Sequence, residues 1–248
     1  MKKILFALAA VLVMALPAQA ADLTVSAAAS LTDAFNAIKA DFAKDHPGIN
    51  IVYNFAASGT LLSQMEKGAP VDVFASADQK TMDQAVEKKL VDVPTRVNFV
   101  RNDLVLAVPA DNPAKIKDLT SLAAASAKRI AIGNPDSVPV GRYSKAALTK
   151  LGQWDALSAK FVMAESVRQV LDYLSRGEVD AGFVYATDAK QGGDKVKVIS
   201  EVPVEAPVIY PIAVAATASD KKAAATFVSY VTGPTGQAIL AKFGFKKP

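Results

Sequence analysis

Apolar and polar residues follow one another along this chain in two spacings that predict strands and helices in turn. Near the N-terminus, residues 23–25 predict a strand, and Leu31, Phe35, Ile38 and Phe42 then recur at helical spacing. The same reasoning predicts further strands at 49–55, 71–74, 103–108, 129–132, 181–185 and 208–215, and further helices at 61–65, 82–90, 141–151, 167–174 and 227–231. Strands that alternate with helices indicate an α/β architecture with mostly parallel strand pairing.

The first twenty residues do not fit this alternation. Lys2 and Lys3 form a short basic region, residues 4–16 are apolar without a charge, and PAQA at 17–20 ends in small residues. This order is typical of a secretory signal peptide, with cleavage expected after Ala20. The apolar run is shorter than the ~20 residues that a membrane-spanning helix needs. We therefore expect residues 21–248 to be exported.

Composition excludes several classes of function. The formal charge is +4, but Lys2 and Lys3 contribute two of those charges, so the exported chain is nearly balanced and has no nucleic-acid footprint. The chain has no cysteine and one histidine, His46, in a predicted turn. His/Cys metal sites therefore lack the ligands they need. A Ser-His-Asp triad would need His46 near a serine at a sheet edge, and the predicted turn places it elsewhere, so we expect that the protein is not an enzyme.

Four segments share one design, in which a predicted strand leads through a short loop of small residues into a predicted helix start. The segments are AAASLTD (27–33), AASGT (56–60), GNPDSVPVG (133–141) and AESV (164–167). Parallel α/β sheets bring such helix starts together at the carboxyl ends of their strands. The first backbone N–H groups of a helix lack partners in that helix and carry partial positive charge, so they can bind an anion. Ser30 and Ser58 would add neutral hydroxyl donors.

Each of these features also has an ordinary structural explanation. A serine before a helix usually caps it, and Ser30 with Asp33 has the spacing of a capping box. Tyr185 ends an apolar strand, where packing in the core with a satisfied hydroxyl is the general expectation. Arg142 and Arg168 follow two of the loops, and we expect both at the surface. The loop pattern alone does not identify a ligand.

The order and spacing of longer motifs are more specific. The segments are AAASLTDA (27–34), SGTL (58–61), GAPVDVFASAD (68–78), GNP with VPVGRY (133–143), GFVYATDA (182–189) and the ending GQAILAKFGF (236–245). Together they resemble the periplasmic molybdate-binding proteins of ABC importers, which are type II periplasmic solute-binding proteins. The resemblance extends over nearly all of residues 21–248, although no single motif would be specific.

The resemblance implies a two-lobed periplasmic binding protein fold of the α/β class, with a mixed, mostly parallel sheet flanked by helices in each lobe. Residues 97–108 and 202–215 lack helical spacing and are long enough to pass between two lobes, so we expect two crossover strands there to act as a hinge. The expected division is a signal peptide at 1–20, a discontinuous first lobe at 21–100 with 212–248, and a second lobe at 101–211.

The resemblance also implies how the ligand is held. Members of this family bind a tetrahedral anion between the lobes with neutral donors only. Carried over by position, Ser30 and Ser58 would supply hydroxyl and backbone N–H donors, Val140 and Val167 backbone N–H donors, and Tyr185 its phenol hydroxyl.

Two positions qualify this expected site. Gly59 stands where some relatives have a third serine, so one possible hydroxyl contact is absent. The matching positions include no acidic residue, which favours tetrahedral over octahedral coordination, although Glu165 lies close in the sequence.

By resemblance, the chain is expected to bind molybdate, and also tungstate, with high affinity in the periplasm and to deliver it to the permease of a membrane ABC importer. Molybdenum would enter as its oxyanion, without direct metal ligands and without a cofactor, and the protein would be a monomer that does not bind nucleic acid. Sulfate is the alternative ligand, since only cavity size would reject it. Hydrogen phosphate is disfavoured, because a pocket of donors offers its hydrogen no acceptor.

Overall fold

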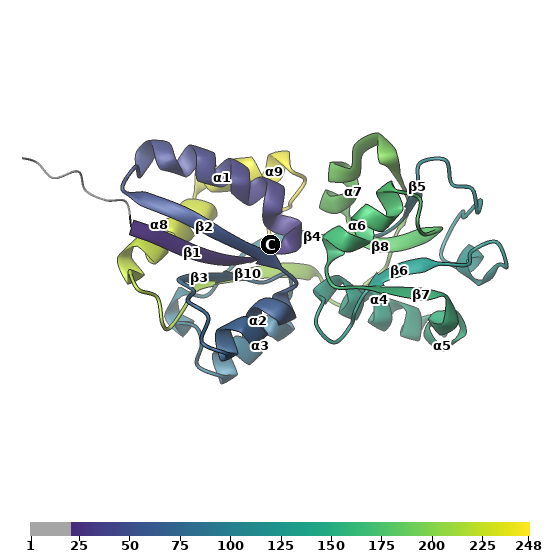
Figure 1. The fold of residues 1–248 in the computed structure, drawn as a ribbon, viewed down its shortest axis with the longest axis horizontal. Coiled ribbons are helices and arrows are strands. Elements are labelled where there is room, and N and C mark those ends of the chain that lie inside the picture. The colour runs from purple at the N-terminus through teal and green to yellow at the C-terminus, as the bar shows by residue number, and fades with distance from the viewer. Residues whose placement is uncertain (1–20) are drawn as a thin grey trace, which may run out of the picture.

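The computed structural model describes residues 21–248, and the expected signal peptide lies outside this range. The described chain folds into two α/β lobes that lie side by side, each built on a five-stranded sheet (Figure 1). Within residues 21–248, none of the helices combines the length and the apolarity that crossing a membrane requires.

The first sheet has the strand order β2-β1-β3-β10-β4. Its strands are β1 (Ala21–Ala28), β2 (Ile49–Ala56), β3 (Val73–Ala75), β4 (Val97–Asn102) and β10 (Val208–Val214). Strand β1 pairs in parallel with β2 and β3, whereas β10 pairs antiparallel with both β3 and β4. The segments that form this sheet thus come from both ends of the chain.

The second sheet repeats this plan with the order β7-β6-β8-β5-β9. Its strands are β5 (Leu104–Pro109), β6 (Ile130–Gly133), β7 (Phe161–Ala164), β8 (Ala181–Tyr185) and β9 (Val196–Glu201). Strand β6 pairs in parallel with β7 and β8, and β5 is antiparallel to both β8 and β9. The expected mixed sheets are confirmed. Four of the five strands in each sheet run in one direction, while the pairings divide equally into parallel and antiparallel.

Helices cover both faces of each sheet (Figure 1). The helices are α1 (Thr32–Asp45), α2 (Ser58–Glu66), α3 (Gln79–Glu87), α4 (Pro139–Lys150), α5 (Trp154–Leu157), α6 (Val167–Ser175), α7 (Ala186–Gly192), α8 (Lys221–Thr232) and α9 (Pro234–Lys242). In the first lobe, α1, α8 and α9 lie opposite α2 and α3, and in the second lobe α6 and α7 lie opposite α4 and α5.

The apolar spacing explains why α1 forms where it does. The expected buried positions Phe35, Ile38 and Phe42 are fully shielded from solvent. Phe35 and Phe42 each pack edge-on against Phe227 of α8, at ring-centroid distances of 6.0 and 5.6 Å. Edge-to-face contacts of this kind add to the stabilisation from area burial. A helical stripe read from the sequence therefore fixes α1 against the C-terminal part of the chain.

The chain passes between the two sheets within both of the extended stretches. It leaves the first sheet at Asn102, the end of β4, and enters the second with Leu104. It leaves the second sheet at Glu201 and returns to the first at Val208. Two short connections therefore join the lobes.

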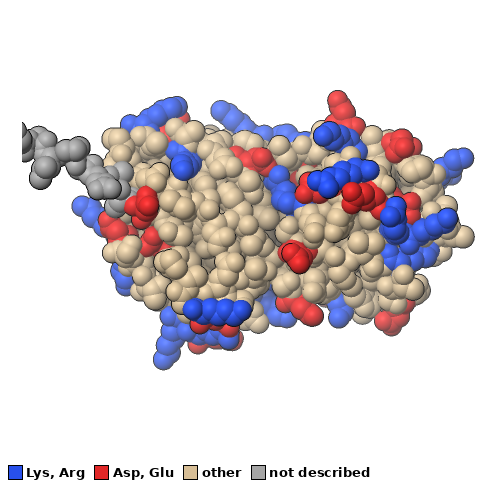
Figure 2. Space-filling model, viewed as in Figure 1, with Lys and Arg blue, Asp and Glu red and all other residues tan. Residues whose placement is uncertain are grey.

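Charged side chains do not gather by sign on the face shown in Figure 2. Lysine and arginine side chains are interspersed there with aspartate and glutamate. This distribution agrees with the near balance of charge in the exported sequence.

A candidate anion site between the lobes

A small cavity lies at the junction of the two lobes. Its lining residues are Ala28, Ala29, Ser30, Ala56, Ala57, Ser58, Ala77, Val138, Pro139, Val140, Val167 and Tyr185. All five residues that the sequence singles out are therefore brought together here, and each is at most 4% exposed. The cavity's free volume of about 10 Å³ is far below the ~300–1,000 Å³ of pockets for drug-sized ligands, so only a compact ligand could be held here.

The first lobe contributes Ser30 and Ser58, and neither serine caps a helix. Ser30 lies inside a 3₁₀ turn, Ala29–Leu31, and its Oγ is 2.9 Å from the hydroxyl of Tyr210. Ser58 is the first residue of α2, and its Oγ accepts a hydrogen bond of 2.9 Å from the backbone N–H of Ala77. The capping expectation was wrong for both. Each hydroxyl is instead held by a partner from another part of its own lobe.

The second lobe contributes two helix starts. Helix α4 begins with Pro139, which has no N–H to leave unpaired, so Val140 carries the first backbone donor of this helix. Helix α6 begins with Val167, and here the preceding Ser166 is a true cap, accepting from the N–H of Gln169 at 3.2 Å. The N–H groups of Val140 and Val167 lack partners within their own helices, and both residues line the cavity.

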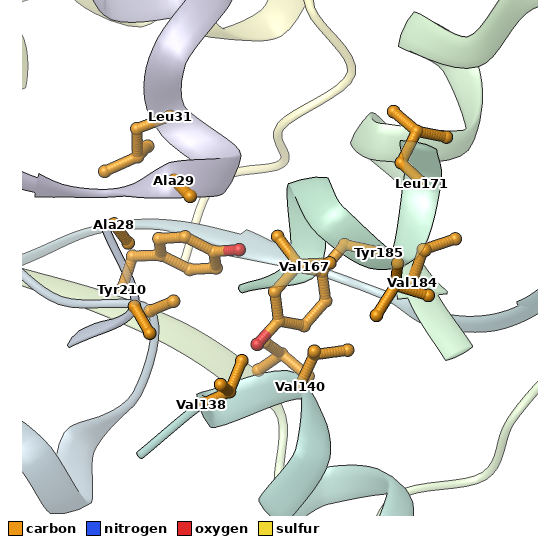
Figure 3. Close-up of a cluster of buried hydrophobic side chains, with 14 of the residues drawn as sticks. Ala28, Ala29, Leu31, Val138, Val140, Val167, Leu171, Val184, Tyr185 and Tyr210 are labelled. Atoms are coloured by element: carbon orange, nitrogen blue, oxygen red, sulfur yellow. The ribbon is translucent and has the colours of Figure 1, made fainter. Parts of the chain in front are cut away.

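Tyr185 ends β8 and points its hydroxyl into the space between the lobes (Figure 3). The hydroxyl is buried without a hydrogen-bond partner, contrary to the expectation for a core tyrosine. Burial raises the pKa of Tyr185 well above its ordinary value, so the phenol keeps its proton and remains a donor. An unpaired buried hydroxyl costs about 1–3 kcal/mol in desolvation, which a bound acceptor would offset.

The character of the cavity follows from these groups. Its lining contains no charged side chain, and its polar groups include hydroxyls and the starts of three helices. In a site closed to water, such donors interact strongly with negative charge. Glu165 is exposed and lines a wider groove outside the cavity, so it does not supply a carboxylate to the site. Among residues 21–248 there is no His/Cys/Asp/Glu cluster that could hold a metal ion.

Two arginines, which the sequence analysis expected at the surface, join the lobes beside the cavity. Arg142 of α4 donates from Nε to Asp78 Oδ2 at 2.8 Å and from Nη2 to Thr81 Oγ1 at 2.7 Å. Asp78 also caps α3, accepting from the N–H of Thr81. This first interlobe contact therefore links two helix starts, one from each lobe.

Arg168 of α6 makes the second interlobe contact. Its Nη1 lies 2.6 Å from Asp33 Oδ2 of α1, its Nη2 donates to the carbonyl of Ser30 at 3.4 Å, and its Nε lies 2.8 Å from Asp188 Oδ1 of α7. An arginine just after a small-residue loop was the available sequence signal for both contacts. The aspartates could not be assigned, because they lie far away along the chain.

A backbone hydrogen bond also connects the two lobes. The N–H of Gly59 donates to the carbonyl of Ser137 at 3.0 Å. A β-carbon built on Gly59 would lie 2.5 Å from that same oxygen, and its nearest neighbours all belong to Ser137 of the opposite lobe. Glycine at this position thus permits the lobes to meet.

The carboxyl group of Asp188 is fully buried behind the site. Burial raises its pKa from 3.8 to about 6, and the nearby Arg168 guanidinium opposes this rise only in part. The folded chain therefore holds a proton on Asp188 at pH values where the unfolded chain has released it.

Comparison with known proteins shows what this chain is similar to. The family model described as "Bacterial extracellular solute-binding protein" matches residues 23–246. The molybdate-binding protein ModA of Escherichia coli (strain K12) is 41% identical, over 90% of this chain and 88% of that protein.

Two solved structures extend the comparison. The Azotobacter vinelandii periplasmic molybdate-binding protein superposes with a TM-score of 0.80 at 28% identity, covering 91% of this chain and 99% of that one. The substrate-binding domain of a putative molybdenum ABC transporter from Clostridium difficile superposes with a TM-score of 0.69 at 37% identity, covering 92% and 99% of the two chains.

The Gly59 contact leads to a prediction about closure. Gly59→Ala should leave each lobe folded, because the three atoms nearest to the added methyl all belong to Ser137 of the opposite lobe. It should disfavour the closed arrangement by about 1–3 kcal/mol, the usual range for overpacking. Small-angle scattering should then show a more open average shape, with an unchanged circular dichroism spectrum. An unaltered scattering profile would show that Gly59 does not limit closure.

The Asp188 carboxyl leads to a prediction about pH. Because its pKa is higher in the folded state, its contribution to the unfolding free energy falls as pH rises from about 4 to about 6 and is constant above that window. Asp188→Asn lacks this proton. The unfolding free energy of the variant minus that of the parent protein should therefore increase across the window, as measured by urea denaturation at several pH values. A difference that stays flat or decreases with pH would contradict the assignment.

Proposed function

Because this chain belongs to the bacterial extracellular solute-binding proteins, we propose that it binds molybdate outside the cytoplasm and delivers it to a membrane ABC importer. The observation that carries the proposal is the small cavity between the lobes, where hydroxyls and helix starts converge without a charged side chain. The relatives named for molybdate binding add support, since the similarity extends over nearly the whole described chain.

In the proposed complex, the anion accepts hydrogen bonds from both lobes. Ser30 and Ser58 donate from the first lobe, Val140 and Val167 donate backbone N–H groups from the second, and Tyr185 donates its hydroxyl. Molybdate carries two negative charges, so each contact is a charge-assisted hydrogen bond. The helix starts add favourable electrostatics without an ionised side chain in contact with the ligand.

Binding is proposed to be coupled to closure of the lobes. The anion first meets the donors of one lobe, and closure then adds the donors of the other and removes water. The two connections between the sheets, near Asp103 and across residues 202–207, would serve as the hinge. The Arg142 and Arg168 contacts are made across the lobes, so they would form only when the protein closes. The closed form would then present a surface from both lobes to the importer.

The remaining expectations complete the proposal. The chain would act as a monomeric periplasmic carrier after removal of its signal peptide, without a cofactor and without catalysis. Tungstate, which resembles molybdate in charge and size, would bind as well. Sulfate is the second candidate, because it has the same charge and shape and differs mainly in size.

A melting experiment tests the choice of ligand. A ligand that binds only the folded form stabilises it by RT ln(1 + [L]/Kd), which is about 2.7 kcal/mol when the ligand is at 100 times Kd. We expect molybdate and tungstate to raise the melting temperature of the ligand-free protein strongly, and sulfate and phosphate at equal concentration to have little effect. A larger shift with sulfate would replace the proposed ligand and keep the site. The absence of a shift with all four would reject the anion site.

Tyr185→Phe tests the site with little structural disturbance. The hydroxyl that it removes has no partner within the protein, so the ligand-free variant should be at least as stable as the parent. Its molybdate affinity should fall by about 1.5–3 kcal/mol, the range for hydrogen bonds to charged groups. Isothermal titration calorimetry measures the affinity, and urea denaturation measures the stability.

Two further variants serve as a second test of the site and as a control. Ser58→Ala should weaken binding by a similar amount, with some loss of stability because Ala77 loses its acceptor. Val140→Ala keeps the backbone donor and should change affinity much less. If Tyr185→Phe binds as tightly as the parent, the tyrosine is not a ligand contact.

A further inference from the structure

We propose that Asn102 and Tyr210, which do not line the cavity, are positioning residues that hold the Ser30 hydroxyl as a one-way donor to the anion. This inference rests on the proposed function, since it concerns how one of the proposed donors is oriented. The observation behind it is a buried chain of hydrogen bonds that begins at the hinge and ends at Ser30.

The chain has three members. Asn102 is the last residue of β4, where the backbone leaves the first sheet. Its Nδ2 lies 3.3 Å from the hydroxyl of Tyr210 on β10, and that hydroxyl lies 2.9 Å from Ser30 Oγ. Tyr210 points toward the same interlobe space as Tyr185 in Figure 3, and the two rings meet at a centroid distance of 5.9 Å.

The direction of these hydrogen bonds is set at Asn102. Its Oδ1 accepts from the backbone N–H of Asp103 at 3.0 Å, so the amide oxygen must face that group. The Nδ2 group therefore faces the other way, where it donates to Thr187 Oγ1 at 2.8 Å as well as to Tyr210. An amide nitrogen can only donate, so the Tyr210 hydroxyl accepts from Asn102.

The remaining directions follow. The Tyr210 oxygen accepts from Asn102, which leaves its own proton available for Ser30. When Ser30 donates its single proton to an anion, Ser30 Oγ can only accept in its bond with Tyr210. The proton of Ser30 is then left to point away from Tyr210, toward the cavity that Ser30 lines. All three residues are at most 4% exposed, so water does not compete for these groups. Burial also raises the pKa of Tyr210, which keeps the phenol protonated.

Orientation of this kind bears on selectivity. A free serine hydroxyl can donate or accept, and it could therefore rotate to accept the hydrogen of a protonated oxyanion. With Tyr210 donating to it, Ser30 already uses one lone pair and gains most by donating in turn, since such chains strengthen in one direction. The arrangement favours a fully deprotonated anion over one that carries a hydrogen.

A double-mutant cycle tests this role with molybdate as the probe in calorimetry. Tyr210→Phe should weaken binding by about threefold to tenfold, the worth of one hydrogen bond. In a Ser30→Ala background, where there is no hydroxyl to orient, Tyr210→Phe should have no further effect. If Tyr210→Phe lowers the molybdate affinity equally with and without the Ser30 hydroxyl, the inference is overturned. A tyrosine with a merely structural role would act independently of Ser30.

Two more variants provide a control and a stronger perturbation for the double-mutant cycle. Tyr53→Phe removes another partly buried tyrosine hydroxyl of the same lobe, one that donates to the carbonyl of Phe35 away from the cavity, and it should leave affinity unchanged. Asn102→Asp places an acceptor where the chain needs a donor, so it should reverse the chain and weaken binding more than Tyr210→Phe does. The new charge would repel the anion in both backgrounds, whereas the part due to reversal should disappear when Ser30 is alanine.

Selectivity supplies an independent readout. The ratio of molybdate to phosphate affinity, measured near pH 6 where every phosphate ion carries one or two hydrogens, should fall in Tyr210→Phe. If the ratio of molybdate to phosphate affinity is unchanged and the double-mutant cycle gives equal losses of molybdate affinity, the positioning role is rejected. Failure of the unsubstituted protein to bind molybdate would instead reject the proposed function, so the two failures are distinguishable.

Discussion

The central constraint on this molecule is that donors are gathered in a closed space without acceptors to satisfy them. Tyr185 buries a hydroxyl with no partner, and Val140 and Val167, which carry the first N–H groups of α4 and α6, line the same cavity. Each such group is costly to bury alone, so the closed arrangement is favoured fully only when an acceptor occupies the space. The two sheets, their repeated strand order and their short connections serve to bring these donors together from opposite sides.

Charge is handled differently inside and around this space. The cavity lining has no ionised side chain, while Arg142 with Asp78 and Arg168 with Asp33 and Asp188 form ion pairs next to it. The positive groups are thus neutralised by protein carboxylates rather than offered to the ligand. A site that binds through neutral dipoles depends little on ionic strength within the cavity, and its preference is set by geometry and by which atoms carry hydrogen.

The extent to which the sequence predicts this structure depends on whether the determining contacts are local. The buried stripe of α1 and the apolar strands β5 and β8 follow from residue spacing, because burial of one face imposes that spacing. The edge strands β7 and β9 were missed, because they are partly exposed and less apolar. The five proposed ligand residues came from resemblance to a family. Spacing alone would have assigned the two serines among them, Ser30 and Ser58, as helix caps. The partners Asp78, Asp188 and Tyr210 come from remote parts of the chain, and a single sequence gives no sign of such pairings.

The backbone contact between Gly59 and Ser137 has a consequence for the dimensions of the site. Main-chain atoms that already touch cannot approach further, so this contact acts as a mechanical stop that fixes the smallest aperture of the closed protein. An anion with shorter bonds would not be gripped more tightly by further closure. Its oxygens would remain at longer distances from the donors, and each hydrogen bond would be weaker. The protein can in this way measure the radius of a tetrahedral anion without any side chain dedicated to that purpose.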